Sequence, residues 1–307
     1  MVVGEWVSIA ISSTGPIDLK KTLESGHSSF PIPVIDKNNR YYLVIFEPKS
    51  KKYVISRVYQ KGAKLGADLY SAPAPLTEND IKEMRKILRI ILGLNFNLEE
   101  FYSTFKNDPI APAFKERKGV RLTRAHNLFE SLICSMITQR NSVWRWNAQA
   151  RKISELMGIR FPVEHFNIYS FPDAKQIYRN KHLLKEAKLG YREEYVIATT
   201  EHIANYQVRL GKLLPLSTIE AKRTLLKLKG IGPKVADMFL LYGLGKIDVP
   251  PTDVWIQRGV SKFFFKGKEK SLEECRDKLV EHYGNWAGLA QLYMYDWMRN
   301  IIGNEKK

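Results

Sequence analysis

The stretch LKLKGIGPKVADMFLL, residues 226–241, places a turn with two glycines between two segments of helical periodicity. The second segment starts with Pro233, a residue favoured in the first turn of a helix. Gly230 and Gly232 let another backbone approach closely, and the amides at the start of the second helix suit a phosphate. A dinucleotide-binding fingerprint does not fit, because the preceding segment is helical and Val235 occupies the third glycine position. The pattern predicts a helix–hairpin–helix.

Lys234 lies in the first turn of the second helix, where the positive end of the helix dipole disfavours a charged ammonium. Neighbouring apolar residues would add desolvation, which also favours the neutral amine. A neutral amine is a nucleophile that can form a Schiff base. On the local pattern alone, an exposed or phosphate-binding lysine is the commoner explanation.

Asp253 follows two prolines in the stretch DVPPTDVWIQRG, residues 248–259, and starts a predicted helix. An N-cap is a very common use of aspartate. The alternative is a carboxylate that faces the positive charge developing on a sugar ring, as in glycoside hydrolysis. Lys234 and Asp253 together could cleave an N-glycosidic bond, although their spacing alone leaves the N-cap explanation open.

The charge balance indicates a polyanionic partner. The 307 residues contain 49 lysines and arginines against 32 aspartates and glutamates, a net charge of +17. Nucleic acid is the leading candidate, because each phosphate that binds Lys or Arg releases counterions. No apolar run has the length of a membrane-spanning helix, and the N-terminus lacks the basic region of a signal peptide. The only cysteines, Cys134 and Cys275, exclude a cysteine-ligated iron–sulfur cluster and favour a reducing cytoplasm.

The chain changes character near residue 77. Before it, EWVSIAIS, YYLVIFEP and KYVISRVYQ are β-rich, and the last two flank a turn as a hairpin would. After it, helical periodicity continues almost without interruption, from a capped start at Thr77 with Gly93 as the first stop. We therefore predict an α+β protein with a small N-terminal antiparallel β domain, residues 1–77, and a larger all-α domain, residues 78–307. Further helices are predicted at residues 97–105, 127–138, 143–158, 192–206, 218–230, 233–245, 254–265, 271–284 and 286–303.

Together these motifs resemble the helix–hairpin–helix DNA glycosylase superfamily, and within it the 8-oxoguanine DNA glycosylase/lyases. The hairpin LKGIGPKVAD is followed by VPPTDV, with Asp253 nineteen positions after Lys234. DLKKTLESGHSSF, GVRLTRAHNLFESLICSMITQRN, LGYREEYV and WAGLAQLYMYDW resemble further segments of that family. The resemblance covers the chain from about Asp18 to the C-terminal helix, and it implies two helical subdomains around an active-site cleft.

The resemblance implies roles for individual residues. Lys234 would be the Schiff-base nucleophile and Asp253 the acid that assists glycosidic cleavage. The carbonyl of Gly26 would accept from N7–H of 8-oxoguanine, and Met238 would flank the base. Gln291 would bind its Watson–Crick edge and Tyr295 would stack on it; these two are four apart on a helix and share a face.

The same resemblance implies contacts with DNA around the lesion. Arg145 and Arg192 would read the orphaned cytosine, Tyr191 would wedge into the duplex, and Arg140 would lie near the gap. In the hairpin, Gly230, Gly232 and Val235 would bind a DNA phosphate. A monovalent cation would lie at the carbonyls of Leu226, Leu228 and Ile231.

Three positions depart from the family pattern. Trp255 stands where a histidine is common, so that phosphate contact is lost or replaced. Met238 replaces a cysteine that packs near the lysine, and His27 replaces a glutamine after Gly26. These departures concern the lesion pocket more than the reaction class.

The implied function is excision of 8-oxoguanine opposite cytosine from duplex DNA, with strand cleavage by β-elimination and no redox cofactor. We expect a monomer that acts on chromosomal DNA in the cytoplasm. Two alternatives remain. A monofunctional glycosylase for alkylated or deaminated purines would share Asp253 and the hairpin but usually lacks the lysine. A non-catalytic DNA-binding module would need only the hairpin and the charge.

Overall fold

The computed structural model describes residues 5–26, 28–72 and 74–304, with side chains up to Arg299. The N-terminal part is a five-stranded antiparallel sheet in the order β1-β5-β4-β3-β2. Tyr41–Glu47 and Lys52–Lys61 form the predicted hairpin, which is confirmed. The elements of this part are β1 (Val7–Ile11), α1 (Leu19–Glu24), β2 (Val34–Ile35), β3 (Tyr41–Glu47), β4 (Lys52–Lys61) and β5 (Lys64–Ser71).

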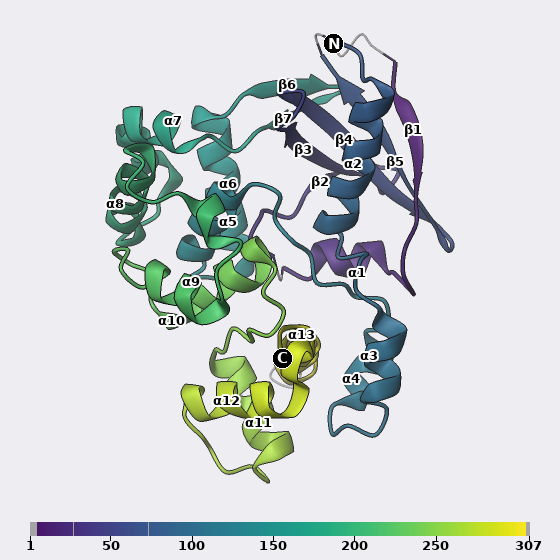
Figure 1. Ribbon diagram of the computed structural model, residues 1–307, viewed down its shortest axis with the longest axis vertical. Helices are drawn as coiled ribbons and strands as arrows, with labels where there is room; N and C mark the ends of the chain where they lie inside the picture. Colours follow the sequence, from purple (N-terminus) through teal and green to yellow (C-terminus); the bar gives the residue numbers. More distant parts are fainter. Residues whose placement is uncertain (1–4, 27, 73, 305–307) are drawn as a thin grey trace.

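Helix α2, Glu78–Ile91, begins at the predicted cap. Thr77 accepts from the amide of Asp80, and Asp80 accepts from the amide of Thr77. Its apolar face packs on the sheet, because Met84 and Leu88 share one buried cluster with residues of β1, β4 and β5. Figure 1 shows α2 lying alongside the sheet. The first predicted helix therefore completes the core of the β part.

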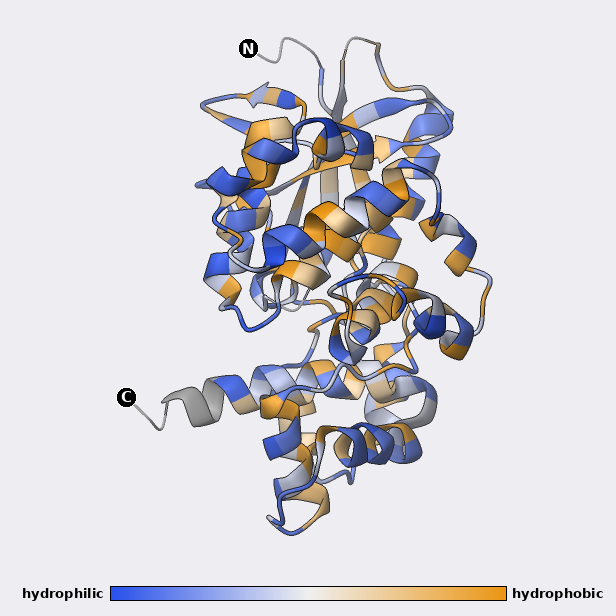
Figure 2. Cartoon of the chain, turned by 90° about the vertical axis from the view of Figure 1, so that its left-hand side faces the viewer, coloured by the Kyte–Doolittle hydropathy of each residue, from blue (hydrophilic) through white to orange (hydrophobic). Residues whose placement is uncertain are grey.

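The rest of the described chain is mainly helical, and its helices form two further cores. One core gathers the helices at residues 128–137, 143–157, 192–204, 218–225 and 233–238, and the other gathers those at residues 98–104, 111–116, 254–264, 272–283 and 287–304. Hydrophobic and hydrophilic residues alternate around these helices, as expected for amphipathic segments (Figure 2). No helix in the described ranges combines the length and apolar character needed to cross a bilayer.

The bounds of the helical elements are α3 (Leu98–Thr104), α4 (Ala111–Glu116), α5 (Leu128–Ile137), α6 (Val143–Met157), α7 (Ala174–Arg179), η1 (Lys181–Ala187), α8 (Arg192–Ala204), η2 (Leu210–Leu213), α9 (Thr218–Leu225), α10 (Pro233–Met238), η3 (Phe239–Leu244), α11 (Val254–Phe264), α12 (Leu272–Tyr283), η4 (Gly284–Trp286) and α13 (Ala287–Asn304).

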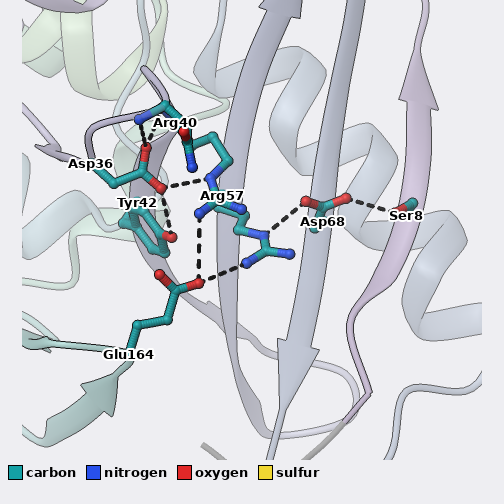
Figure 3. A network of polar contacts seen from close by, with 8 residues as sticks. Ser8, Asp36, Arg40, Tyr42, Arg57, Asp68 and Glu164 are labelled. Carbon is teal, nitrogen blue, oxygen red and sulfur yellow. Dashed lines mark hydrogen bonds and ion pairs between the residues drawn. The ribbon is translucent and has the colours of Figure 1, made fainter.

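One strand pair interrupts the predicted run of helices. β6 (Arg160–Val163) and β7 (Phe166–Tyr169) form an antiparallel hairpin beside the sheet. Its tip carries Glu164, whose carboxylate lies 3.1 Å from Arg57 of β4 (Figure 3). The ring of Phe166 packs edge-on against Tyr42, with ring centroids 5.0 Å apart. These contacts are non-local, so helical periodicity in the sequence could not reveal them.

Candidate active site

The predicted helix–hairpin–helix is present at residues 218–238. α9 starts with a capping box between Ser217 and Glu220 and ends at Leu225, earlier than expected. Gly230 has φ +81°, and a Cβ there would lie 2.3 Å from the Tyr195 ring of α8. Only glycine fits that approach. After the N-cap Gly232, the chain enters α10, whose second residue is Lys234.

Lys234 and Asp253 face each other across the two helical cores. The Lys234 Nζ lies 3.7 Å from the Asp253 Oδ2, although 19 residues separate them in the chain. α10 packs through Val235 and Ala236 in one core, whereas α11 packs through Ile256 in the other. The pair is therefore held between two separately packed bodies.

The two oxygens of the Asp253 carboxylate make different contacts. Its Oδ1 accepts from the amides of Trp255 (3.0 Å) and Ile256 (3.2 Å), which caps α11. Its Oδ2 is the oxygen that faces Lys234. The side chains of Lys234 and Asp253 are 40% and 20% exposed, so the desolvation of the lysine expected from the sequence is modest. The N-cap and the catalytic explanations of Asp253 do not exclude each other.

Two tyrosines surround Asp253. Burial, and then the negative charge of Asp253, raise the pKa of Tyr295. Burial, then Tyr295, and then Asp253 raise the pKa of Tyr242. Tyr295 comes from α13 and Tyr242 from η3, the π-helical continuation of α10. Both hydroxyls therefore stay protonated at neutral pH.

Gln291 lies one turn before Tyr295 on α13 and is 2% exposed. Among the described residues its Oε1 has no hydrogen-bond partner. A buried polar atom without a partner costs roughly 1–3 kcal/mol, so a ligand that supplied one would be favoured. Met238, at the end of α10, has its sulfur 3.5 Å from the Thr138 hydroxyl, which places it beside α5.

Gly26 packs against the start of α6. Its φ is +72°, and a Cβ there would lie 2.4 Å from Cγ1 of Val143. A side chain at residue 26 would therefore strain the backbone and collide with α6. His27, the next position of the predicted lesion-recognition segment, lies outside the described residues.

The loop between α5 and α6 is fastened by Arg192. The Arg192 guanidinium is buried and donates to the carbonyls of Gln139, Arg140 and Leu189. The Gln139 side chain in turn donates to the Gly230 carbonyl at 3.0 Å, which ties this loop to the hairpin. Tyr191 stays 49% exposed, with the Arg192 guanidinium 4.5 Å from its ring centroid.

The predicted opposite-base residues thus differ in their environment. Arg140 and Arg145 are exposed on the α5–α6 loop and the first turn of α6. Arg192 is committed to backbone carbonyls, so in this state it positions the loop. Arg140 has φ +44°, an unusual value for a residue other than glycine.

No known family model matches the chain. A probable N-glycosylase/DNA lyase of Methanothermobacter thermautotrophicus is 27% identical over 245 residues, 73% of this chain and 78% of the relative. The structure of MBOgg1 with a low-affinity DNA ligand aligns with a TM-score of 0.83 at 22% identity, over 97% of this chain and 99% of the other. The Clostridium acetobutylicum 8-oxoguanine glycosylase/lyase with DNA aligns at 0.81 and 21% identity, covering 98% of this chain and 100% of that one.

In sequence the chain is similar to proteins named N-glycosylase/DNA lyase, and it shares the fold of solved DNA glycosylases. Its fold alone does not select one member. The 3-methyladenine DNA glycosylase of Archaeoglobus fulgidus also aligns, with a TM-score of 0.77 at 22% identity over 96% of this chain and 99% of the other. The side chains around Lys234 and Asp253 must make that distinction.

Leu228 of the helix–hairpin–helix turn is one of the three residues whose carbonyls are predicted to bind a monovalent cation. The Leu228 carbonyl accepts from the Ile231 amide at 3.1 Å, which leaves it one further lone pair. Backbone carbonyl oxygens coordinate monovalent cations such as K⁺. Within the described ranges, no three His, Cys, Asp or Glu side chains gather as they would around a metal ion.

The sequence analysis did not predict Asp237 and Tyr242, which lie next to the predicted catalytic pair. Asp237, three residues after Lys234, is 3% exposed; it lies 2.7 Å from Lys222 of α9 and 3.6 Å from Arg276 of α12. Tyr242 beside Asp253 was also missed. A carboxylate inside an apolar helix was a signal for Asp237, because buried acids are nearly always paired. At the departure Trp255, the indole lies 5.4 Å from the Arg258 guanidinium.

Proposed function

We propose that this chain is a bifunctional DNA glycosylase/lyase that excises 8-oxoguanine opposite cytosine from duplex DNA. The observation that carries the proposal is the approach of Lys234 to Asp253 at 3.7 Å. A nucleophilic amine beside a carboxylate suits a reaction that develops positive charge on a sugar. A non-catalytic DNA-binding module would not need this pair.

In the first step the neutral Lys234 amine attacks C1′ of the damaged nucleoside. A C–N bond forms as the N-glycosidic bond breaks, and the base leaves with the bonding electron pair and takes up a proton. Asp253 stabilises the positive charge on the sugar. The sugar ring opens to a Schiff base, which acidifies the 2′ hydrogen. Loss of that proton expels the 3′ phosphate and nicks the strand on the 3′ side of the lesion.

The lesion pocket in this proposal is made by Gly26, Met238, Gln291 and Tyr295. The unpartnered Oε1 of Gln291 supports it, because the Watson–Crick edge of a purine offers N–H donors. A flipped base costs a few kcal/mol of stacking and pairing, which contacts of this kind offset.

DNA is bound around this pocket. The hairpin amides near Gly230, Gly232 and Val235 would bind a phosphate, with a monovalent cation at the neighbouring carbonyls. Arg140, Arg145, Tyr191 and Arg192 would hold the opposite strand. The partner is then double-stranded DNA with a damaged purine, on chromosomal DNA in the cytoplasm. One chain supplies both catalytic residues, so a monomer suffices.

Base release separates this proposal from its alternatives. Duplexes that carry 8-oxoguanine, hypoxanthine, uracil or an alkylpurine are incubated with the protein, and released base and nicked strand are measured separately. The proposal predicts release of 8-oxoguanine with nicking at the same site. Release of an alkylpurine or hypoxanthine without nicking would instead indicate a monofunctional glycosylase. Binding without any release would indicate a DNA-binding module.

A further inference from the structure

Trp144 is 81% exposed, the highest value among the large apolar side chains of the described residues. It lies in the first turn of α6, directly after the N-cap Ser142 and Val143. The opposite face of α6 is buried through Trp146 and Asn147. An indole fully presented to water has no role in the core, and burying it on a partner would be favourable.

The neighbours of Trp144 place it beside the proposed DNA-binding cleft. Val143, one position before, packs on Gly26. Arg145, one position after, is exposed on the same helix turn. Arg140 is exposed on the loop that leads into α6, and Arg192 fastens that loop. The exposed indole therefore lies in the same helix turn as Arg145, at the end of α6 that follows the loop carrying Arg140.

We propose that Trp144 stacks on a nucleobase of the strand opposite the lesion, next to the orphaned cytosine. The inference rests on the proposed function, and it adds a contact that the family resemblance does not assign. Every base presents an aromatic face, so an exposed indole on a segment that also carries Arg140 and Arg145 suits nucleic acid. The cations Arg140 and Arg145 match the phosphates of that strand. Since Arg145 is the residue predicted to read the cytosine, Trp144 reaches the base pair beside it.

Equilibrium binding tests the contact without requiring catalysis. The probe is a duplex with a tetrahydrofuran abasic-site analogue opposite cytosine, titrated with the protein at several salt concentrations. Loss of one base–aromatic stack should raise the Kd of Trp144→Ala about 10- to 100-fold. Trp144→Phe should restore most of the affinity. The slope of log Kd against log salt should stay unchanged, because no phosphate contact is lost.

The control is Ile219→Ala on α9, which removes a 71% exposed apolar side chain and should leave the Kd unchanged. Thermal unfolding midpoints of all variants should equal that of the wild type, because these side chains are exposed. A Kd for Trp144→Ala equal to that of the wild type would overturn the inference. So would an equal loss in Trp144→Ala and Trp144→Phe.

The strand is tested with 2-aminopurine, a fluorescent base that stacking quenches. Placed beside the cytosine, it should be quenched by the wild type and not by Trp144→Ala. Placed at the matching position of the lesion strand, it should respond equally to both proteins. The opposite pattern would contradict the assignment. If the wild type itself does not prefer the abasic-site duplex to undamaged DNA, the proposed function fails. If the wild type shows that preference and the Kd of Trp144→Ala is unchanged, only this inference fails.

Discussion

Asp253 faces Lys234 with one carboxylate oxygen at 3.7 Å and caps α11 with the other. The cap fixes the carboxyl plane, and Pro250 and Pro251 restrict the chain that leads into it. The orientation of Oδ2 toward Lys234 is therefore set by the same contacts that start the helix. This double use lets stability and chemistry be separated by substitution.

Asp253→Asn should keep the cap and lose the chemistry. The amide oxygen can still accept from Trp255 and Ile256, so the free energy of unfolding should change by less than about 0.5 kcal/mol. Single-turnover excision should fall by about 10²–10⁴, because the charge facing the sugar is gone. DNA affinity should be retained. Asp253→Ala is the comparison: it should lose activity and also about 1 kcal/mol of stability. Turnover of Asp253→Asn at the wild-type rate would refute the catalytic role.

Gly26→Ala should disturb both the backbone and α6. The positive φ and the 2.4 Å approach of a Cβ to Val143 predict a loss of about 1–3 kcal/mol in chemical denaturation. Excision of 8-oxoguanine should fall further than this instability explains, because the Gly26 carbonyl is moved. The double substitution Gly26→Ala with Val143→Ala removes the collision and should recover part of the stability. If Gly26→Ala has the same free energy of unfolding and the same excision rate as the wild type, the Gly26 segment is not part of the pocket.

The buried ion cluster under the hairpin should be costly to break. Asp237 lies between Lys222 and Arg276, and burial raises its pKa. Asp237→Ala removes the buried carboxylate from Lys222 and from Arg276, which keeps its contact with the exposed Asp277, and should destabilise the fold by about 3–5 kcal/mol. Glu194→Gln, which removes the exposed partner of Lys229, should cost less than about 1 kcal/mol. Similar small losses for both variants would contradict a structural role for the cluster.

Glu130 predicts a pH dependence of stability. It lines a cavity of about 600 Å³ that also borders β3, and burial raises its pKa to about 8. The folded protein therefore holds this proton more tightly than the unfolded chain, whose carboxyl has a pKa near 4.5. Stability from this group is complete below pH 4.5 and declines as the pH rises toward 8.

Glu130→Gln should remove that decline. Relative to the wild type it should gain about 3–4 kcal/mol in unfolding free energy between pH 5 and pH 8. Glu186→Gln, at an exposed glutamate of η1, should follow the wild type at both values. A gain in Glu130→Gln that is the same at pH 5 and pH 8 would contradict a raised pKa.

Local patterns predicted the elements that have local causes. The cap of α2 was predicted from Thr77 and Asp80. The hairpin was predicted from Gly230, Gly232 and Pro233. The β6–β7 pair was not predicted, because its strands are short and one of them contains Pro162. Its stability comes from Tyr42 and Arg57, which are more than a hundred positions away. Tertiary contacts of this kind leave no periodicity in the sequence.

In the candidate site too, features that depend on tertiary contacts could not be predicted from local sequence. The approach of Lys234 to Asp253 was expected only through the family resemblance, because it depends on how two helical cores meet. The exposure of Lys234 could not be read from its apolar neighbours, since Val235 and Ala236 point into the core while Lys234 does not. Arg192 shows the same limit: the family resemblance implies a base contact, whereas its guanidinium donates to the carbonyls of the α5–α6 loop.

Borohydride trapping tests the central claim most directly, because it captures the Schiff base between Lys234 and C1′. The protein is incubated with an 8-oxoguanine·cytosine duplex and borohydride, and the covalent protein–DNA adduct is mapped by peptide mass spectrometry. We predict an adduct at Lys234 that is absent from Lys234→Gln and undiminished in Lys229→Gln, a change of the neighbouring hairpin lysine. An adduct at another residue, or 8-oxoguanine release that persists at the wild-type rate in Lys234→Gln, would contradict the assignment.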